Sequence, residues 1–175
     1  VYGQDDGSAV DESSPTEPSH FSGRRLLEAE ALARSRTNAV IVRFSGIYGP
    51  GRTRLIDRVR ARIPVSAQPR LWTNRIHSDD CAAVLAHLLA LPRPDPVYIG
   101  SDDEPAPLDV VQNTLAGLLG QAPLPTASDA GPPGERGRRC CNARLRSSGL
   151  QLRYPNHRRG YRALLADPGQ GRLGV

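Results

Sequence analysis

The chain has 175 residues, enough for one domain with its own core. Its hydrophobic fraction of 38% is low for a globular protein, and 17 Gly with 16 Pro predict many turns. The 23 basic residues, all of them arginine, exceed the 18 acidic residues and give a net charge of +5. The arginines are not interleaved with the aromatic residues that stack nucleic-acid bases, so we expect no nucleic-acid partner.

The cysteines point to a reducing compartment. There are three of them, Cys81, Cys140 and Cys141, and an odd number of unpaired thiols is typical of a cytoplasmic protein. The chain contains no CxxC motif and no histidine at a metal-ligand spacing, so we expect no metal site. No apolar run approaches the roughly 18 residues that a membrane-spanning helix needs, so we expect no membrane partner.

The first third of the chain predicts a loop, a helix and a strand. Residues 3–19 are polar and proline-containing, which is typical of a loop. Residues 22–36 predict a helix whose leucines and alanines form a face expected to pack against the core. Residues 39–45 are almost uninterruptedly apolar, which predicts a strand covered on both faces.

That strand leads into a turn rich in glycine and proline, from Ser45 to Gly51. Ligands of open α/β sheets bind at the carboxyl ends of the strands, and glycine lets the backbone approach a ligand closely. The turn is therefore the first candidate for a ligand site.

The remaining segments alternate between helix and strand. The pattern predicts helices over 53–62, 79–91 (with Ser78 as its cap), 108–119, 142–148 and 155–166, and short strands at 75–77, 96–100 and 138–141. This alternation predicts an α/β fold with a parallel sheet. The strands are too few for a complete doubly wound sheet, which predicts a portion of one.

Five short segments, in order, carry a resemblance to a known family. They are Val1-Tyr2-Gly3, the acidic loop 10–15, the helix start 23–30, the turn 43–51 and Arg75-Ile76-His77-Ser78-Asp79-Asp80. Together they resemble the extended short-chain dehydrogenase/reductase superfamily and, within it, the NAD-dependent epimerase/dehydratase family. The resemblance implies an NAD(P)-binding, Rossmann-type doubly wound parallel sheet with a small C-terminal substrate domain, and NAD or NADP as the cofactor.

The resemblance also implies a division of the chain. Residues 1–100 match the C-terminal half of the dinucleotide-binding domain, residues 101–166 match a small α/β substrate-binding region, and residues 167–175 are expected to form a frayed tail. The family's glycine-rich dinucleotide fingerprint and catalytic serine would lie before Val1. We therefore expect this chain alone to bind the cofactor weakly and to be inactive.

The catalytic pair of the family, Tyr-x-x-x-Lys, is degenerate here. Phe21 aligns with the tyrosine and Arg25 with the lysine, while a register one residue later places Ser22 and Leu26 there. The tyrosine serves the family as acid/base, and phenylalanine has no proton to give. Arg25 could still contact the cofactor ribose. Tyr2 is a further candidate proton donor, with a packed ring as the alternative.

Further site residues follow from the resemblance. Phe44, Ser45 and Ile47 match positions that line the nicotinamide side, and Gly46 replaces an asparagine that contacts substrate in the family.

The helix start at 75–80 and Arg43 each allow two interpretations, one functional and one structural. Arg75 and His77 are candidate substrate contacts, although His77 with the two following aspartates equally fits a helix cap. Arg43 either binds a substrate anion or forms a structural ion pair.

Two functions remain open. One is an NAD(P)-dependent epimerase/dehydratase-like oxidoreductase with an atypical active site, acting on a sugar-like or small carbonyl or hydroxyl substrate. The other is a non-catalytic, dinucleotide-sensing regulatory protein on the same fold. In either case, the resemblance implies a small-molecule partner and a homodimer formed through helix 22–36.

Overall fold

The computed structural model describes residues 1–127 and 131–166, so the tail predicted at 167–175 lies outside the described residues. The helices are α1 (Phe21–Arg36), α2 (Arg54–Arg60), α3 (Ser78–Ala90), α4 (Leu108–Leu118), α5 (Ala143–Ser147) and α6 (His157–Ala166). The strands are β1 (Ala9–Val10), β2 (Ile41–Phe44), β3 (Gly46–Tyr48), β4 (Arg70–Thr73), β5 (Arg75–His77), β6 (Val97–Gly100), β7 (Ala106–Pro107), β8 (Glu135–Gly137) and β9 (Arg139–Cys140).

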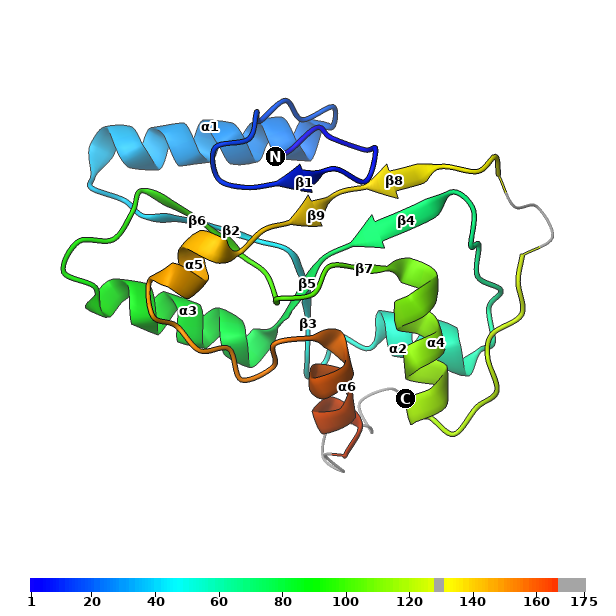
Figure 1. Ribbon diagram of the computed structural model, residues 1–175. Helices are drawn as coiled ribbons and strands as arrows, with labels where there is room; N and C mark the ends of the chain where they lie inside the picture. The colour runs from blue at the N-terminus through cyan, green and yellow to red at the C-terminus, as the bar shows by residue number, and fades with distance from the viewer. Residues whose placement is uncertain (128–130, 167–175) are drawn as a thin grey trace.

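One nearly continuous strand, β2 followed by β3, organises the fold (Figure 1). β2 pairs in parallel with β6, and β3 pairs in parallel with β5. Only Ser45 separates the two halves, and its backbone N–H donates to the Gly100 carbonyl at 2.9 Å. The chain therefore changes its pairing partner at Ser45, where the backbone leaves β6.

Two apolar clusters lie on either side of this strand. Side chains of β5, β6, α3 and α5 form one of them, with Ile76, Tyr98 and Leu145 fully buried. Side chains of α2, α4 and α6 gather around Tyr48 of β3 to form the other. Deep burial of these apolar groups is the main favourable contribution to folding, and it fixes β3 and β5 between the clusters.

Short strands extend the structure beyond this centre. β4 pairs antiparallel with β7 and parallel with β8, and β1 pairs in parallel with β9. In Figure 1, β8 and β9 run beneath the N-terminal segment and bring residues of the last third of the chain beside the first ten. The sequence did not predict β1, β3, β4, β7 or β8, because these short strands lie mostly in polar or glycine- and proline-rich segments without a distinct apolar run.

The predicted α/β class and the parallel strand after Ala39 are confirmed, but two burial expectations are wrong. α1 buries only Gly23; Leu26 and Leu32 are 57% and 58% exposed. β2 is half-buried along its whole length rather than covered on both faces. The reason is that too few of the described residues pack against this side of the sheet to cover it.

The predicted cap of α3 is also wrong. Ser78 is the first residue of the helix, and His77 precedes it as the N-cap. The imidazole Nδ1 of His77 accepts a hydrogen bond from the Asp79 backbone N–H at 3.1 Å. This bond satisfies one of the free N–H groups of the first turn, which is the task a serine cap would have performed.

Candidate functional site

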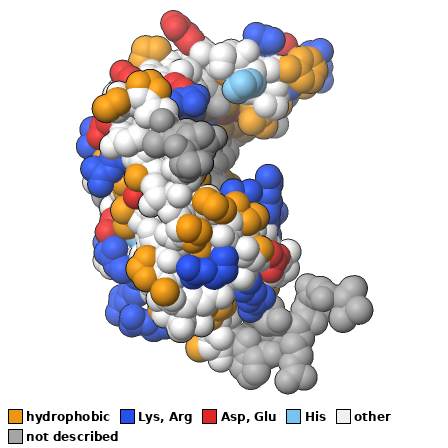
Figure 2. Space-filling model, turned by 90° about the vertical axis from the view of Figure 1, so that its right-hand side faces the viewer, with side chains coloured by type: hydrophobic (Ala, Val, Ile, Leu, Met, Phe, Trp, Pro, Cys, Tyr) orange, Lys and Arg blue, Asp and Glu red, His pale blue; other side chains and the backbone are white. Residues whose placement is uncertain are grey.

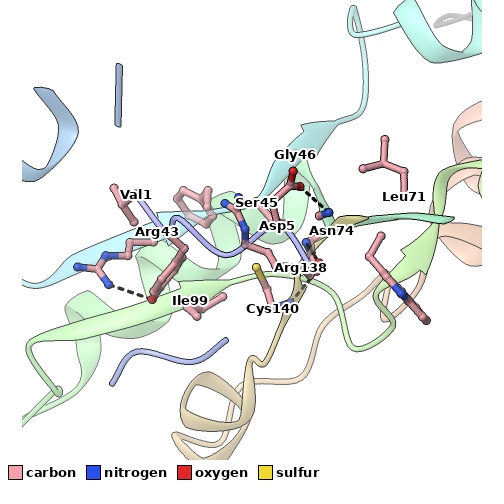
Figure 3. A pocket seen from close by; sticks show the side chains of 14 residues that line it. Val1, Asp5, Arg43, Ser45, Gly46, Leu71, Asn74, Ile99, Arg138 and Cys140 are labelled. Carbon is pink, nitrogen blue, oxygen red and sulfur yellow. Dashed lines mark hydrogen bonds between the residues drawn. The ribbon is translucent and has the colours of Figure 1, made fainter. Parts of the chain in front are cut away.

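The cleft lies where β2 ends and β3 begins. A cavity of about 460 Å³ is lined there by Phe44, Ser45 and Gly46, together with Trp72 and Asn74 from the facing segment. Figure 2 shows a deep notch between the upper and lower parts of the molecule, and Figure 3 shows the lining side chains of the cavity at close range. The turn predicted as a ligand site thus borders an open space rather than packed side chains.

An ion pair ties α1 to the strand that forms the cleft floor. Arg43 donates from Nε and Nη2 to the two carboxylate oxygens of Glu30, at 3.1 and 2.8 Å, and from Nη1 to the Tyr2 hydroxyl at 2.9 Å. Both charged side chains are largely buried, with exposures of 13% and 15%. Arg43 is therefore engaged in structure on all three of these nitrogens, which supports the structural alternative for this residue.

Tyr2 is held in its protonated form by this arrangement. Its ring is buried, and burial raises the pKa of its hydroxyl, partly opposed by the hydrogen bond from Arg43. Tyr2 also lines the cleft, where the N-terminal segment meets β2. It is both packed and adjacent to the open space.

The opposite wall of the cleft is fastened by an asparagine that sequence reasoning missed. The Asn74 side chain donates to the Arg138 carbonyl at 2.9 Å and accepts from the Cys140 backbone N–H at 2.7 Å. These bonds join Asn74, which lies between β4 and β5, to Arg138 and to Cys140 of β9. Nothing in a lone asparagine signals such a contact, because its partners lie 64 and 66 residues away.

The two registers of the degenerate catalytic pair occupy different surroundings. Phe21 is 64% exposed, and Arg25 forms an exposed ion pair with Glu28 while its guanidinium lies over the Phe21 ring. Ser22 and Leu26, one residue later, instead line a cavity of about 290 Å³. Tyr2 and Arg138 line the same cavity and also the main cleft.

Residues 46–48, predicted as part of a turn, form strand β3, and a second space lies on the other side of the Ser45–Tyr48 segment. This cavity, of about 540 Å³, is lined by Gly46, Ile47 and Arg75 and by the rings of Tyr48 and Tyr161. It brings together three of the predicted site positions, whereas Phe44 and Ser45 face the first cleft. Gly46 borders both spaces, since it is where the backbone changes partner.

His77 is enclosed in an aromatic stack beside this cavity. Its ring packs against Tyr154 at a centroid separation of 4.2 Å and meets Tyr48 edge-on at 5.2 Å. Burial lowers the pKa of the imidazole, and the nearby carboxylate of Asp79 partly opposes this effect. Asp80 is also buried and accepts the backbone N–H groups of Arg153 and Tyr154 at 2.8 and 2.9 Å. The helix-cap alternative for this motif is the one the hydrogen bonds support.

Sequence reasoning also missed a buried polar group formed by Arg75, Asp102 and His157. Burial raises the pKa of Asp102 to about 8, although Arg75 pulls it down. Burial and the same guanidinium lower the pKa of His157 to about 4. The signal for Asp102 was its position just after the buried strand at 96–100, where a parallel sheet presents its ligand-binding edge.

Two kinds of feature are absent from the described residues. Within residues 1–127 and 131–166, no three His, Cys, Asp or Glu side chains gather in an arrangement that could hold a metal ion. Over the same ranges, no helix combines the length and the apolarity needed to cross a membrane.

Comparison with solved structures decides the family. A protein from Methylobacillus flagellatus, described as an NAD-dependent epimerase/dehydratase, is 43% identical and superimposes with a TM-score of 0.83 over 95% of this chain. The chain belongs to the NAD-dependent epimerase/dehydratase family. It spans 60% of the length of the Methylobacillus protein and matches the family's C-terminal portion.

Further relatives extend the comparison. A functionally unknown conserved protein from Silicibacter pomeroyi DSS is 35% identical, with a TM-score of 0.78 over 95% of this chain and 62% of its own. The human epimerase family protein SDR39U1, solved with NADPH, shares the fold at 20% identity and a TM-score of 0.78, over 93% of this chain and 61% of its own. No family model and no curated protein matches the chain.

Proposed function

We propose that this chain forms the C-terminal part of an NAD(P)-dependent epimerase/dehydratase-like oxidoreductase with an atypical active site. The observation that carries the proposal is the open cleft at the carboxyl end of β2, in a chain 43% identical to a family member over nearly its whole length. The degenerate pair, Phe21 and Arg25 in place of tyrosine and lysine, makes the active site atypical, and the alternative register, Ser22 and Leu26, lines the separate cavity of about 290 Å³.

The nicotinamide end of the cofactor would lie against the Phe44–Ile47 segment. The backbone here departs from β6, so the end of the strand is free to face a flat ring. Gly46 has no side chain, and a Cβ at this position would be 3.0 Å from the Asn74 carbonyl oxygen. The human relative was solved with NADPH, which supports a nicotinamide dinucleotide as the cofactor class.

The cofactor, when bound, accepts or supplies a hydride, and the chain must then move a proton at the substrate oxygen. Phe21 and Arg25 are exposed; Arg25 lies over the Phe21 ring and forms an ion pair with Glu28 of the same helix. Both are therefore poorly placed for that proton transfer. The Ser22 hydroxyl and the Tyr2 phenol both border the cavity of about 290 Å³. We propose that they take part in hydrogen bonding to the reacting oxygen, with Arg43 orienting the phenol.

The rest of the chain has supporting roles in this proposal. Residues 1–100 complete the dinucleotide-binding domain, and residues 101–166 close over a sugar-like or small carbonyl or hydroxyl substrate. The exposed leucines of α1 favour a homodimer formed through this helix. The three free cysteines favour a cytoplasmic protein, and the bacterial origin of two relatives favours a bacterial type.

A second candidate is a dinucleotide-sensing protein without catalysis. Leu26 lines the cavity where a lysine would otherwise hold the ribose and lower the pKa of the tyrosine. A site that has lost both groups can retain binding while losing proton transfer.

The test uses the protein expressed from its complete gene, including any residues encoded before Val1. NADH and NADPH are titrated by calorimetry, and turnover is then followed at the nicotinamide absorbance with a panel of sugars and small carbonyl compounds. Binding with turnover supports the oxidoreductase, and binding without turnover supports the sensor. Failure to bind either dinucleotide would overturn both.

A further inference from the structure

The cavity of about 540 Å³ beside the Ser45–Tyr48 segment has an unusual electrostatic lining. Four of its lining residues are arginines: Arg52, Arg54, Arg58 and Arg75. No aspartate or glutamate lines it among the described residues. Its volume of about 540 Å³ lies in the range of small-molecule sites, and Tyr48, Tyr161 and Leu108 provide an apolar wall.

Three of these arginines have no ionic partner within the part of the chain that the structure describes. Arg52, Arg54 and Arg58 are exposed, and none of their side chains forms an ion pair or hydrogen bond with residues 1–127 or 131–166. The nearest carboxylate in the sequence, Asp57, is engaged elsewhere: it accepts from Thr53 Oγ1 at 2.6 Å and lies 3.7 Å from Arg60. Uncompensated like charges in one place repel one another, and an anion relieves that repulsion.

Arg75 adds an independent observation on the inner side of the same cavity. Its side chain is buried with 5% exposure, and its Nη2 donates to Thr73 Oγ1 at 2.7 Å. Among the described residues, its Nη1 has no hydrogen-bond partner, and the Tyr48 hydroxyl has none either. Leaving a buried charged donor unpaired costs more than leaving a neutral one, so a ligand acceptor at this place would be stabilising.

We propose that this cavity binds the anionic group, a carboxylate or a phosphate, of a small substrate, with Arg54 and Arg58 at the rim and Arg75 on the inner side. Planar guanidinium groups match both oxyanions in geometry, which makes arginine the suitable residue for such recognition. The inference rests on the proposed function, because it names the chemical class of substrate that the same protein takes.

The position of the cavity agrees with that role. It shares Gly46 and Asn74 with the cleft proposed for the nicotinamide. The two spaces therefore meet at these residues, where the Gly46 backbone N–H donates to the Asn74 carbonyl at 3.1 Å. A substrate anchored by its anion in the arginine cavity would approach the cofactor at this boundary.

The experiment measures binding of glucose 6-phosphate, glucuronate and neutral glucose by calorimetry, with no dinucleotide present. We expect either anion to bind and glucose not to bind. The R54Q/R58Q variant should lose about tenfold or more in affinity for the anion, as expected for the loss of charge-assisted hydrogen bonds. The matched control R34Q/R36Q removes the same charge from exposed arginines of α1 and should bind like the parent protein.

Chemical protection provides a second measurement that needs no variant. Phenylglyoxal modifies accessible guanidinium groups, and mass spectrometry locates the modified residues. The bound anion should protect Arg54 and Arg58 and leave Arg34 and Arg36 reactive.

Several outcomes would overturn the inference. They are equal binding of glucose and the anions, equal losses in R54Q/R58Q and R34Q/R36Q, and equal protection of both pairs. NADPH is titrated separately, so a protein that binds NADPH but neither anion refutes this inference alone. A protein that binds the anions but no dinucleotide refutes the proposed function instead.

Discussion

Replacement of Glu30 by alanine tests what holds α1 over the cleft. The helix buries only Gly23, so apolar packing contributes little to its attachment. Glu30 accepts two hydrogen bonds from Arg43 of β2, at 2.8 and 3.1 Å, in a pair that is 13% and 15% exposed. Of the hydrogen bonds that the Arg43 guanidinium makes within the described residues, the variant keeps the one to the Tyr2 hydroxyl.

The expected loss of stability follows from this burial. Removing one partner of a buried ion pair costs about 3–5 kcal/mol, and the remaining solvent contact places this pair near the lower end, at about 3 kcal/mol. For a protein of this size, each kcal/mol lowers the melting temperature by about 2–4 °C. We therefore expect Glu30→Ala to lower it by about 6–12 °C.

The assay is thermal and urea unfolding followed by far-ultraviolet circular dichroism. Glu28→Ala is the matched control, because Glu28 lies on the same helix and pairs with Arg25 in a contact that is 62% and 61% exposed. Exposed pairs of this kind contribute about 0.3–0.5 kcal/mol. A double-mutant cycle with Arg43→Met isolates the coupling. If Glu30→Ala costs no more than Glu28→Ala, the pair does not anchor the helix.

Three further predictions concern buried groups. Asp102 keeps its proton up to about pH 8 in the folded state, whereas the unfolded state releases it near pH 3.8, so this residue makes the free energy of unfolding fall as the pH rises from about 4 to about 8. Asp102→Asn should reduce this pH dependence of the free energy of unfolding, measured by urea titration. Gly160→Ala would drive a methyl group into the Tyr48 ring and should cost about 1–3 kcal/mol or more by thermal unfolding, whereas Gly117→Ala, which meets nothing within 4 Å, should not. With a thiol reagent at pH 8, exposed Cys141 should react first, and Cys81 and Cys140, whose pKa values burial raises to about 11, should react slowly.

The elements that could be predicted from sequence are those with a long period or a distinct apolar run. The helices at α3 and α4, and strands β2 and β6, carry such patterns and lie within a few residues of their predicted bounds. The extent of α1 was also predictable, but the burial of its face was not, because an amphipathic pattern does not say whether a partner surface is present.

The site was harder to predict than the fold. The glycine and proline residues of the Ser45–Gly51 segment predicted a ligand site, and this segment does border both cavities. Asn74 and His157 gave no signal, since their roles depend on residues distant in the chain. By resemblance to the family, Phe21 and Arg25 align with the catalytic positions. In the structure, Ser22 and Leu26 of the alternative register are the residues that line a cavity. A shift of one residue turns a helix by about 100°, and sequence alone did not fix that rotation.

Trp72 offers the most direct measurement of whether the cleft at the end of β2 holds the nicotinamide. It is the only tryptophan of the chain and lines that cleft. When NADPH or NADH is titrated into the protein expressed from its complete gene, the parent protein should show more quenching and more energy transfer to the reduced nicotinamide than the Trp72→Phe variant, and the difference reports on Trp72. Dinucleotide binding detected by calorimetry with unchanged Trp72 emission would show that the ring lies elsewhere.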